Sequence, residues 1–284
     1  MRVHDSIDST LNNPRRVALV TGGATGIGRA LCEELAARGL FVVVADINLT
    51  GAKEVAAALE QRNCRAEAVA LDVSRAADVE TVVNDIATRH GQLDFIFNNA
   101  AVAAVGELRD GNIEDFRRIV DVNLLGVVHG TMAAYRVMLR QGFGHIINVS
   151  SVTGLMPTPI LSAYGMTKWA IIGFSLGLRA EASELGVNVS VACPGLVQTS
   201  ISDRSAYWNV SKEDYLKWLP WRNNMLAPAA TARAILRGVE RNREIIVFPF
   251  SARVAWRLYR LYPAIFNPLL RRTLRSFRAL RLKP

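Results

Sequence analysis

Short apolar runs alternate with longer amphipathic stretches along most of the chain. The short runs are typical of strands buried on both faces, and they lie at residues 17–21, 41–45, 66–71, 93–97, 145–149, 188–192 and 244–248. Helical spacing of apolar positions occurs between them, at residues 30–35, 50–62, 75–90 and 229–240, in a long stretch ending near 139, and around Tyr164. This alternation predicts an α/β fold, a doubly wound parallel sheet of about seven strands with helices on both faces.

A glycine-rich turn follows the first predicted strand. It reads Thr21-Gly-Gly-Ala-Thr-Gly-Ile-Gly28 and leads directly into helix-forming residues. Glycines let the backbone approach phosphate groups, and a helix N-terminus presents unpaired N–H groups with a partial positive charge. The second strand ends in Asp46, about 20 residues beyond the turn, where an acid accepts hydrogen bonds from an adenosine ribose. Turn and acid together predict a dinucleotide site at the carboxyl ends of the strands.

Tyr164 and Lys168 form a second candidate site with Ser151. Lys168 follows Tyr164 by four positions, so a helix places both side chains on one face. An ammonium stabilises a neighbouring phenolate, which lowers the pKa of the phenol. Ser151 precedes Tyr164 by 13 residues, at the end of a predicted strand, and its hydroxyl can hold a carbonyl oxygen against the phenol. The three residues predict proton transfer to a reacting oxygen.

The chain resembles the short-chain dehydrogenase/reductase family from about Arg16 to Pro249. The resemblance rests on motifs in this order: the glycine turn, Asn98-Asn99-Ala100, Asn123, Ser151, Tyr164-x-x-x-Lys168 and Pro194-Gly195. The resemblance implies a single Rossmann-type catalytic domain over residues 15–250, assembled into a homodimer or homotetramer through the helices of Asn123 and Tyr164. It implies that Tyr164 is the general acid/base and that Lys168 tunes it while holding the nicotinamide ribose. Ser151 would position the reacting oxygen, Asn123 would maintain a water-mediated proton relay, and Ser150 would be structural. Ala101 departs from the family pattern, which usually has glycine there.

The same resemblance implies a set of residues around the cofactor. They are Thr21, Gly22, Thr25, Gly26, Ile27, Gly28, Asp46, Ile47, Asp72, Val73, Asn99, Ala100, Tyr164, Lys168, Pro194, Gly195, Val197 and Thr199. The carboxylate of Asp46 would repel the extra phosphate of NADP, and Thr25 and Ile47 stand where members that prefer NADP usually carry a basic residue. Arg29 is expected to point away from this phosphate. NAD is therefore the predicted cofactor.

The composition of the chain predicts the cellular compartment of the protein. The three cysteines among 284 residues are scattered, without metal-ligand spacing, which fits a reduced cytoplasmic protein without a metal site. Residues 1–14 are polar and lack the apolar stretch of a signal peptide, so a flexible tail is expected. Residues 141–167 contain no Asp, Glu, Lys or Arg, but their glycines and prolines argue against a membrane helix.

The positive charge is concentrated in a C-terminal extension, residues 251–284. The whole chain carries 34 basic and 25 acidic residues, a net charge of +9, and the extension holds nine basic residues and no acid, so residues 1–250 are neutral (9 − 9 = 0). Its apolar residues have helical spacing, and Pro263 and Pro268 divide it into two short helices. Such helices either lie in the headgroup layer of an anionic membrane or pack their apolar side on the body or on a second subunit. Nucleic-acid binding is not expected, because no recognition fold accompanies the charge.

Aromatic residues are concentrated in the stretch that covers the substrate in the family, residues 200–227. They and their apolar neighbours are Tyr207, Trp208, Tyr215, Trp218, Leu219, Trp221, Met225 and Leu226. An aromatic lid indicates a large apolar ligand, and the alternative for each single residue is ordinary packing of a short helix onto the body. Leu155, Met156 and Ile160 are expected to line the same pocket. The predicted reaction is NAD-dependent interconversion of a lipophilic secondary alcohol, such as a steroid, retinoid or lipid alcohol, and its ketone. The alternatives are an NADPH-dependent ketone or ketoacyl reductase and a non-catalytic, membrane-associated nucleotide-binding scaffold.

Overall fold

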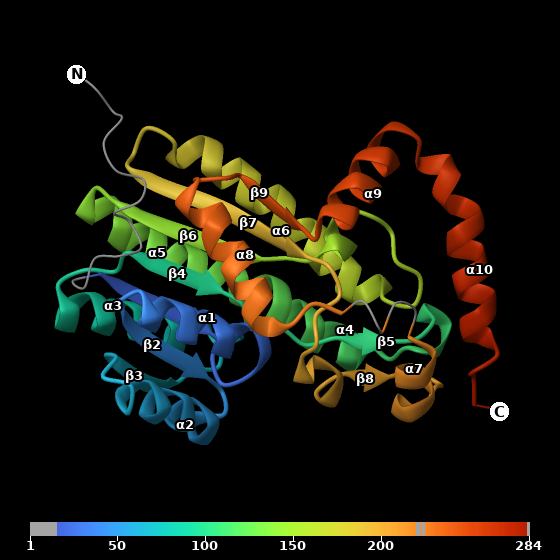
Figure 1. Ribbon diagram of the computed structural model, residues 1–284, viewed down its shortest axis with the longest axis horizontal. Helices are drawn as coiled ribbons and strands as arrows, with labels where there is room; N and C mark the ends of the chain where they lie inside the picture. Colours follow the sequence, from blue (N-terminus) through green and yellow to red (C-terminus); the bar gives the residue numbers. More distant parts are fainter. Residues whose placement is uncertain (1–15, 220–221, 223–224, 283–284) are drawn as a thin grey trace.

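The computed structural model describes residues 16–219, 222 and 225–282, so the predicted tail at residues 1–14, Trp221 and Lys283 lie outside the described residues. Seven parallel strands form one sheet in the order β3-β2-β1-β4-β6-β7-β9 (Figure 1). These strands are β1 (Val17–Thr21), β2 (Phe41–Asp46), β3 (Ala66–Ala70), β4 (Phe95–Asn98), β6 (Gly144–Val149), β7 (Val187–Pro194) and β9 (Ile245–Phe248). The predicted doubly wound parallel sheet is confirmed.

Helices cover both faces of the sheet. They are α1 (Gly26–Ala37), α2 (Leu49–Glu60), α3 (Ala76–His90), α5 (Gly126–Gln141), α6 (Ser162–Ala182) and α8 (Pro228–Glu240), whereas α4 (Ile113–Ile119) packs on α6 and on β5 (Ala104–Val105) of a small second sheet. Buried side chains of α1, α2 and α8, such as Leu31 and Ile235, share one apolar core with the sheet. Side chains of α3, α5 and α6, such as Val83 and Leu178, form a second core. Burial on both faces fixes the strand ends from which the site is built.

The chain reverses its path across the sheet between β1 and β4. β2 pairs with one edge of β1 and β4 with the other, both in parallel. Ligands of doubly wound sheets bind outside the carboxyl ends of the strands at such a switch point. The glycine turn follows β1 and Asn99 follows β4, so the fold brings both motifs to the switch point.

The predicted long helix ending near residue 139 is interrupted rather than uniform. A π-helical segment, η2 (Val120–Leu125), joins α4 to α5. The whole stretch, Ile113–Gln141, is long and apolar enough to cross a membrane, but half of its most apolar window is buried inside the protein. Because α5 packs on β4 and β6, it is better explained as a core helix of the sheet.

A small second sheet holds the stretch that the sequence predicts as a lid. In it, β8 (Ala206–Tyr207) pairs in parallel with β5 (Ala104–Val105). Short helices adjoin the pair along the chain: η1 (Leu108–Asp110) follows β5, η4 (Ser200–Asp203) precedes β8 and α7 (Lys212–Trp218) follows it, whereas η3 (Val152–Gly154) packs on α6. Strands of two residues show no periodicity, so the sequence did not predict them. The lid is therefore held by the segment that follows β4.

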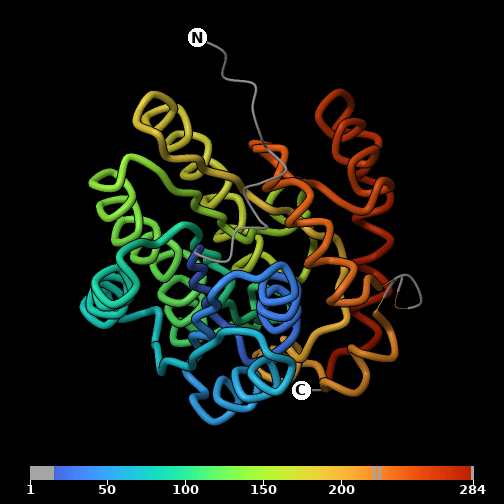
Figure 2. The backbone as a smooth tube through the Cα atoms, turned by 60° about the vertical axis from the view of Figure 1, so that its left-hand side comes forward, coloured from blue at the N-terminus to red at the C-terminus, as the bar shows by residue number. Residues whose placement is uncertain are grey.

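The C-terminal extension forms two helices, as predicted. After β9 come α9 (Phe250–Leu261), the 3₁₀ turn η6 (Pro263–Phe266) and α10 (Asn267–Arg278). Pro263 opens η6 and Pro268 occupies the first turn of α10, where a missing N–H costs no hydrogen bond. Figures 1 and 2 show the pair at the end of the molecule away from α2 and β3, with α10 running past α7.

Candidate active site

The glycine turn is shaped so that only glycine fits at its key positions. Gly22 and Gly26 have φ angles of +65° and +55°, in the left-handed region. A Cβ atom at Gly28 would stand 2.0 Å from the carbonyl oxygen of Gly22. Within the described residues, Thr25 makes no side-chain cap on α1, whose first turn holds no acid. The N–H groups of this helix start therefore face the site without a competing acceptor, as a diphosphate requires.

Thr21 and Asn99 join the ends of β1 and β4 beneath the turn. The Thr21 hydroxyl accepts hydrogen bonds from the backbone N–H groups of Asn99 at 3.0 Å and Ala100 at 3.1 Å. The Asn99 side chain donates to the Thr21 carbonyl at 2.9 Å. Thr21 thus positions the cofactor-facing backbone from behind rather than facing the cofactor itself.

Asp46 ends β2 as a buried carboxylate with capacity left for a ligand. It is 2% exposed, and it accepts from the N–H groups of Ala24 at 3.0 Å and Asn48 at 2.9 Å. A carboxylate accepts about four hydrogen bonds, so lone pairs remain for ribose hydroxyls. Arg29 pairs with Glu33 at 2.9 Å, which agrees with its predicted direction away from the site.

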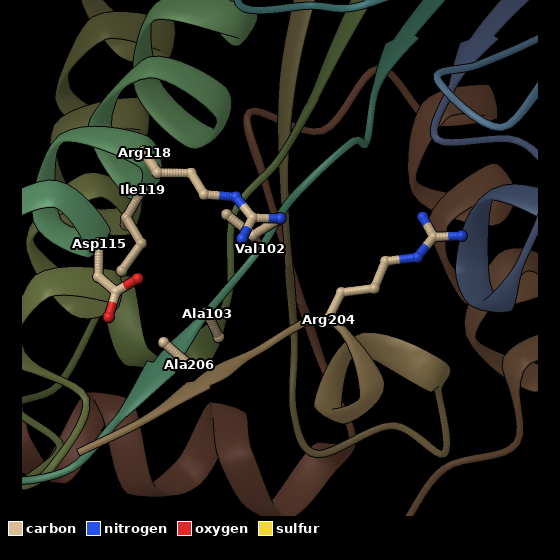
Figure 3. A pocket seen from close by; sticks show the side chains of 7 residues that line it. All are labelled: Val102, Ala103, Asp115, Arg118, Ile119, Arg204 and Ala206. Atoms are coloured by element: carbon tan, nitrogen blue, oxygen red, sulfur yellow. The ribbon is translucent and has the colours of Figure 1, made fainter.

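Arg204 is a cation at this end of the site that sequence reasoning missed. Its guanidinium Nη1 lies 3.9 Å from a carboxylate oxygen of Asp46. Figure 3 shows the side chains of Arg204 and Arg118 at a small pocket of about 10 Å³, and both also line the main cavity. Arg204 follows η4 in the lid and Arg118 lies on α4, so no sequence motif connects either residue with Asp46.

Asp72, predicted for the adenine side, and Gly195 and Thr199, predicted for the nicotinamide loop, follow different strands, and their contacts with the cofactor stay predictions. Asp72 follows β3, and one of its oxygens accepts from the backbone N–H and the hydroxyl of Ser74 at 3.0 and 2.7 Å. Thr199 faces the glycine turn, since a Cβ at Gly26 would lie 3.1 Å from its methyl group. Gly195, after β7, is fixed by a hydrogen bond from its N–H to the Phe248 carbonyl at 2.8 Å. The two ends of the site are therefore built on different strand ends.

Tyr164 and Lys168 share one face of α6, but the lysine does not act on the phenol in the predicted way. The Lys168 ammonium donates to the Val149 carbonyl at 2.9 Å and lies 5.4 Å from the centre of the Tyr164 ring. Burial raises the pKa of Tyr164 to about 12, against a lowering effect from a hydrogen bond with Ser151. Burial also lowers the pKa of Lys168 to about 8. The predicted lowering of the Tyr164 pKa by the neighbouring ammonium is therefore wrong: burial dominates, and the lowering contribution comes from Ser151.

Neighbouring serines divide two tasks after β6. The Ser150 hydroxyl donates to the Lys168 carbonyl at 2.8 Å, tying α6 to the strand end. Ser150 is therefore structural, as predicted. The Ser151 hydroxyl accepts a long hydrogen bond of 3.2 Å from the Thr153 N–H and forms a hydrogen bond with Tyr164. A substrate oxygen can thus meet two hydroxyl groups at one point.

Asn123 lies in the π-helical segment η2 and behind the wall of the site. Its side chain is fully buried and pairs twice with Val102, accepting from the N–H and donating to the carbonyl, both at 2.8 Å. These bonds fix the chain after β4 against the helix. π-Helical segments are frequent at functional sites, but here the amide itself is engaged with backbone. The predicted proton relay through this residue stays a prediction.

One cavity of about 1050 Å³ joins most of the predicted residues. Those that line it are Gly22, Thr25, Gly26, Ile27, Asp46, Ile47, Asp72, Val73, Asn99, Ala100, Ser151, Tyr164, Lys168, Pro194, Gly195, Val197 and Thr199. Thr21, Gly28 and Asn123 do not line it, because their atoms are used in packing or backbone hydrogen bonds behind the wall. Cofactor and substrate candidates therefore share a continuous space.

The lid contributes apolar side chains to this cavity, but fewer than predicted. Tyr207, Tyr215, Trp218 and Leu219 line it, together with Met156 and Ile160. The prediction that Leu155 lines the cavity was wrong, and Leu155, Trp208 and Leu226 are packed elsewhere. Leu155 joins the core on α6, Trp208 is buried with its indole N–H donating to Asp115 at 2.9 Å, and Leu226 bridges to Val197. Met225 is likewise absent from the lining, and Trp221 lies outside the described residues.

The C-terminal extension forms the remaining wall, which the sequence did not indicate. Ser251, Ala252 and Ala255 of α9 line the cavity, as do Phe266, Leu269, Leu270 and Thr273 at the start of α10. The helical spacing of these apolar positions was visible, but a periodic face does not say which surface it meets. The cavity thus extends from Tyr164 into the space beside the extension.

The inner face of α10 packs on the lid. Phe277 is 1% exposed and meets Trp218 edge-on, with ring centres 5.4 Å apart. Arg278 donates to Glu107 at 2.7 Å, and Arg281 donates to Glu107 at 2.9 Å and to Asp110 at 2.6 Å. Of the two predicted alternatives for this apolar face, packing on the body is the one that the structure shows. Two of the nine basic residues are thereby neutralised by the body.

These residues fit a nicotinamide dinucleotide. The glycine turn leaves a cradle that a Cβ would fill, the start of α1 presents its N–H groups, and Asp46 keeps free acceptor capacity. Together with the hydroxyl groups of Ser151 and Tyr164, the arrangement can bind a dinucleotide and exchange a proton with a substrate oxygen in one cavity.

Comparisons with known proteins agree with this geometry. A family model described as short chain dehydrogenase matches residues 16–209. An uncharacterized oxidoreductase of Staphylococcus epidermidis is 32% identical over 188 residues, 66% of this chain and 80% of that protein. The crystal structure of a short chain dehydrogenase/reductase from Burkholderia phymatum in complex with NAD is 26% identical, with a TM-score of 0.80, and covers 86% of this chain and 92% of that one. LigD in its apo form, from a Sphingobium species, is 27% identical with a TM-score of 0.75 over 89% of this chain and 96% of that one.

Proposed function

Because the chain belongs to the short-chain dehydrogenase family, we propose that it is an NAD-dependent oxidoreductase that interconverts a lipophilic secondary alcohol and its ketone. The observation that carries this proposal is the single cavity, which joins the dinucleotide residues to Ser151, Tyr164 and Lys168 and continues between apolar walls. Ligand cavities of this kind are lined mainly by apolar side chains with a few polar groups that orient the ligand.

The choice of NAD rests on Asp46. A buried carboxylate accepts from ribose hydroxyls and repels a phosphate in the same place. The structural relative from Burkholderia phymatum binds NAD, which supports the same cofactor here. A bound nicotinamide would supply hydride transfer to and from the reacting carbon. The glycine turn would hold the diphosphate and Asp46 the adenosine ribose.

The chain's own groups handle the proton. The substrate oxygen accepts hydrogen bonds from Ser151 and Tyr164, which fixes the reacting carbon toward the cofactor side of the cavity. In ketone reduction the Tyr164 phenol donates its proton to this oxygen, and its raised pKa keeps that proton in place at neutral pH. In alcohol oxidation the phenolate takes the hydroxyl proton, and the hydrogen bond with Ser151, which lowers the pKa of Tyr164, stabilises that anion.

The walls beyond Tyr164 indicate a lipophilic substrate. Tyr215, Trp218 and Leu219 of the lid face the cavity, and Leu270 and Thr273 of α10 complete it. No aspartate or glutamate lines this end, among the residues that the structure describes. Sugars and hydroxy acids need several hydrogen-bonding partners, so a bulky alcohol with one polar group suits the cavity better.

Arg204 favours a second candidate, an NADPH-dependent ketone or ketoacyl reductase. Its guanidinium lies beside Asp46, where an added ribose phosphate would stand. The buried carboxylate in the same place opposes this alternative. A non-catalytic scaffold is disfavoured, because it requires none of the hydroxyl and ammonium groups that surround the reacting position.

The test is turnover by the purified full chain with NAD and with NADP over a panel of lipophilic and small secondary alcohols. We expect reduction of NAD with a lipophilic alcohol. Tyr164→Phe removes the proton-transferring hydroxyl, so kcat should fall by about 10² to 10⁴ while NAD still binds.

Tyr135→Phe is the matched control, since it removes a phenol hydroxyl from α5 outside the cavity, and it should leave kcat unchanged. Preference for small sugars or hydroxy acids would contradict the substrate class. Equal use of NADP would contradict the cofactor. Turnover that survives in Tyr164→Phe would contradict the mechanism.

A further inference from the structure

We propose that the junction of the C-terminal helices docks on the headgroup layer of an anionic lipid bilayer, beside the opening of the cavity. This surface, called the tip below, comprises residues 257–272, from the end of α9 through η6 to the start of α10. Figure 1 shows the tip as a turn at the outer edge of the molecule, with the lid at the other end of α10.

Large apolar side chains are exposed along the tip. They are Leu258, Leu261, Tyr262, Ile265 and Leu269, with exposed fractions between 46% and 70%. Five such side chains are exposed within twelve consecutive residues, and a concentration of exposed apolar side chains in a folded protein marks an interaction site. Tyr262 has an apolar ring with a polar end, a character favoured at membrane interfaces.

Arginines flank this apolar surface on both helices. Arg257 and Arg260 lie at the end of α9, and Arg271 and Arg272 lie in the first turns of α10, all exposed. Within the part of the chain that the structure describes, Arg257, Arg271 and Arg272 form no ion pair, whereas Arg278 and Arg281 are bound to Glu107 and Asp110. The tip therefore keeps a free positive charge, the complement of anionic headgroups.

The structure limits how the extension can meet a bilayer. The apolar face of α10 that holds Leu274 and Phe277 packs on the lid, so α10 does not offer this face to lipid. The tip remains available, as an apolar wedge between arginines. Side chains of this size reach the boundary between headgroups and acyl chains while the arginines stay among the phosphates.

The cavity reaches the base of the tip. Phe266, Leu269 and Leu270 line it, and Leu269 is also 46% exposed, so this side chain stands at the rim. A lipid-soluble alcohol leaving the bilayer at the tip would enter the cavity without crossing water. This last step rests on the proposed function; the docking surface itself does not.

A second copy of the chain is a poorer occupant of the tip. A symmetric contact places the same patch of both subunits together, and here it would bring the arginines of the two tips close without acids to pair with them. Other exposed apolar side chains suit self-association better, such as Met132 on α5 and Met166 and Trp169 on α6. The bilayer therefore agrees with both the apolar and the charged residues.

The experiment is flotation of the full chain with vesicles of phosphatidylcholine alone or mixed with phosphatidylglycerol. We expect binding to the mixed vesicles only, weakening as salt rises. Arg271→Gln with Arg272→Gln should weaken the partition coefficient about thirty-fold. Leu261→Ser with Ile265→Ser should weaken it more than tenfold. Neither pair lines the cavity, so turnover of a water-soluble secondary alcohol should be unchanged.

Matched control pairs exist elsewhere on the surface. Leu185→Ser with Ile113→Ser removes two exposed apolar side chains, and Arg62→Gln with Arg241→Gln removes two exposed charges; both should bind like the unaltered chain. Absence of binding to the mixed vesicles, or tip variants that bind as well as these controls, would overturn the proposal. A tip-dependent dimer seen by light scattering without vesicle binding would overturn it in favour of a second copy.

Failure of the proposed function gives a different result. Tyr164→Phe does not alter the tip and should bind vesicles like the unaltered chain. Vesicle binding that depends on the tip, in a chain that turns over no alcohol, would retain the docking surface and reject the oxidoreductase.

Discussion

The two ends of the cavity are built in different ways. At the cofactor end, the glycine turn, Asp46 and Asn99 stand directly at the ends of adjacent strands and are held by backbone hydrogen bonds of 2.9 to 3.1 Å. At the substrate end, the walls come from the lid and from α9 and α10, which meet through side chains. The first end is fixed by the sheet, and the second is assembled by docking.

This difference separates binding of the cofactor from selection of the substrate. Strand ends in a packed sheet keep their positions when a distant segment changes, because each is buried on both faces. The lid and α10 depend on each other through Tyr215, Trp218 and Phe277. A change at this contact should therefore affect the substrate and leave the cofactor unaffected.

Phe277→Ala breaks the contact where the expected effect is largest. Truncating a buried phenylalanine costs about 3–5 kcal/mol, and here the loss falls on the docking of α10 rather than on the sheet. We expect KM for a lipophilic alcohol to rise at least tenfold, while the Kd of NAD changes less than twofold. Steady-state kinetics and calorimetric titration of NAD measure the two quantities.

Phe250→Ala is the matched control, because that phenylalanine at the start of α9 is 73% exposed. It should leave both quantities unchanged. An equal loss of NAD binding in Phe277→Ala would show that the two ends are not separate.

The same contrast explains how much could be predicted from the sequence. The cofactor end was predictable because its chemistry lies in short motifs: glycines spaced for a turn, an acid at a strand end, and Tyr164 with Lys168 one helix turn apart. Buried strands also appear in the sequence as short apolar runs, so this pattern predicted the sheet.

The substrate end was only partly predictable, because helical periodicity does not name a partner. The apolar face of α10 predicted membrane binding and packing on the protein body equally well. The structure shows Phe277 packed on the lid. Aromatic residues of the lid could not be sorted into cavity and core: Trp218 lines the cavity, whereas Trp208 is buried against Gly111. Arg204 was missed because its partner Asp46 is 158 residues away (204 − 46 = 158).

Arg204→Gln tests a lid residue that reaches the cofactor end. Removing a half-exposed cation beside a carboxylate is worth roughly 1 kcal/mol, so we expect kcat/KM with NADP to fall about fivefold. The value with NAD should change less than twofold, since Asp46 keeps its backbone hydrogen bonds. Competition of the two cofactors in one assay measures the ratio. Arg118→Gln, which lacks a contact with Asp46, should leave the ratio unchanged; a fall of the same size there would show that only general charge matters.

The smallest effect concerns the ion pairs that fasten α10. Hydrogen bonds from Arg278, and then from Arg109 and Arg281, lower the pKa of Glu107 to about 2. An acid with a lowered pKa stabilises the folded arrangement fully above its ordinary pKa of 4.5, and this contribution is lost as pH falls from 4.5 toward 2. We expect cleavage of α10 by pepsin to increase a few-fold over this pH window, before the sheet unfolds.

Glu107→Gln should show the higher cleavage rate already at the upper end of the window, and Glu54→Gln, on the exposed side of α2, should not. If Glu107→Gln and the unaltered chain are cleaved at the same rate at pH 4.5, the ion pairs do not hold α10, and the packing of Phe277 alone joins the substrate wall to the body.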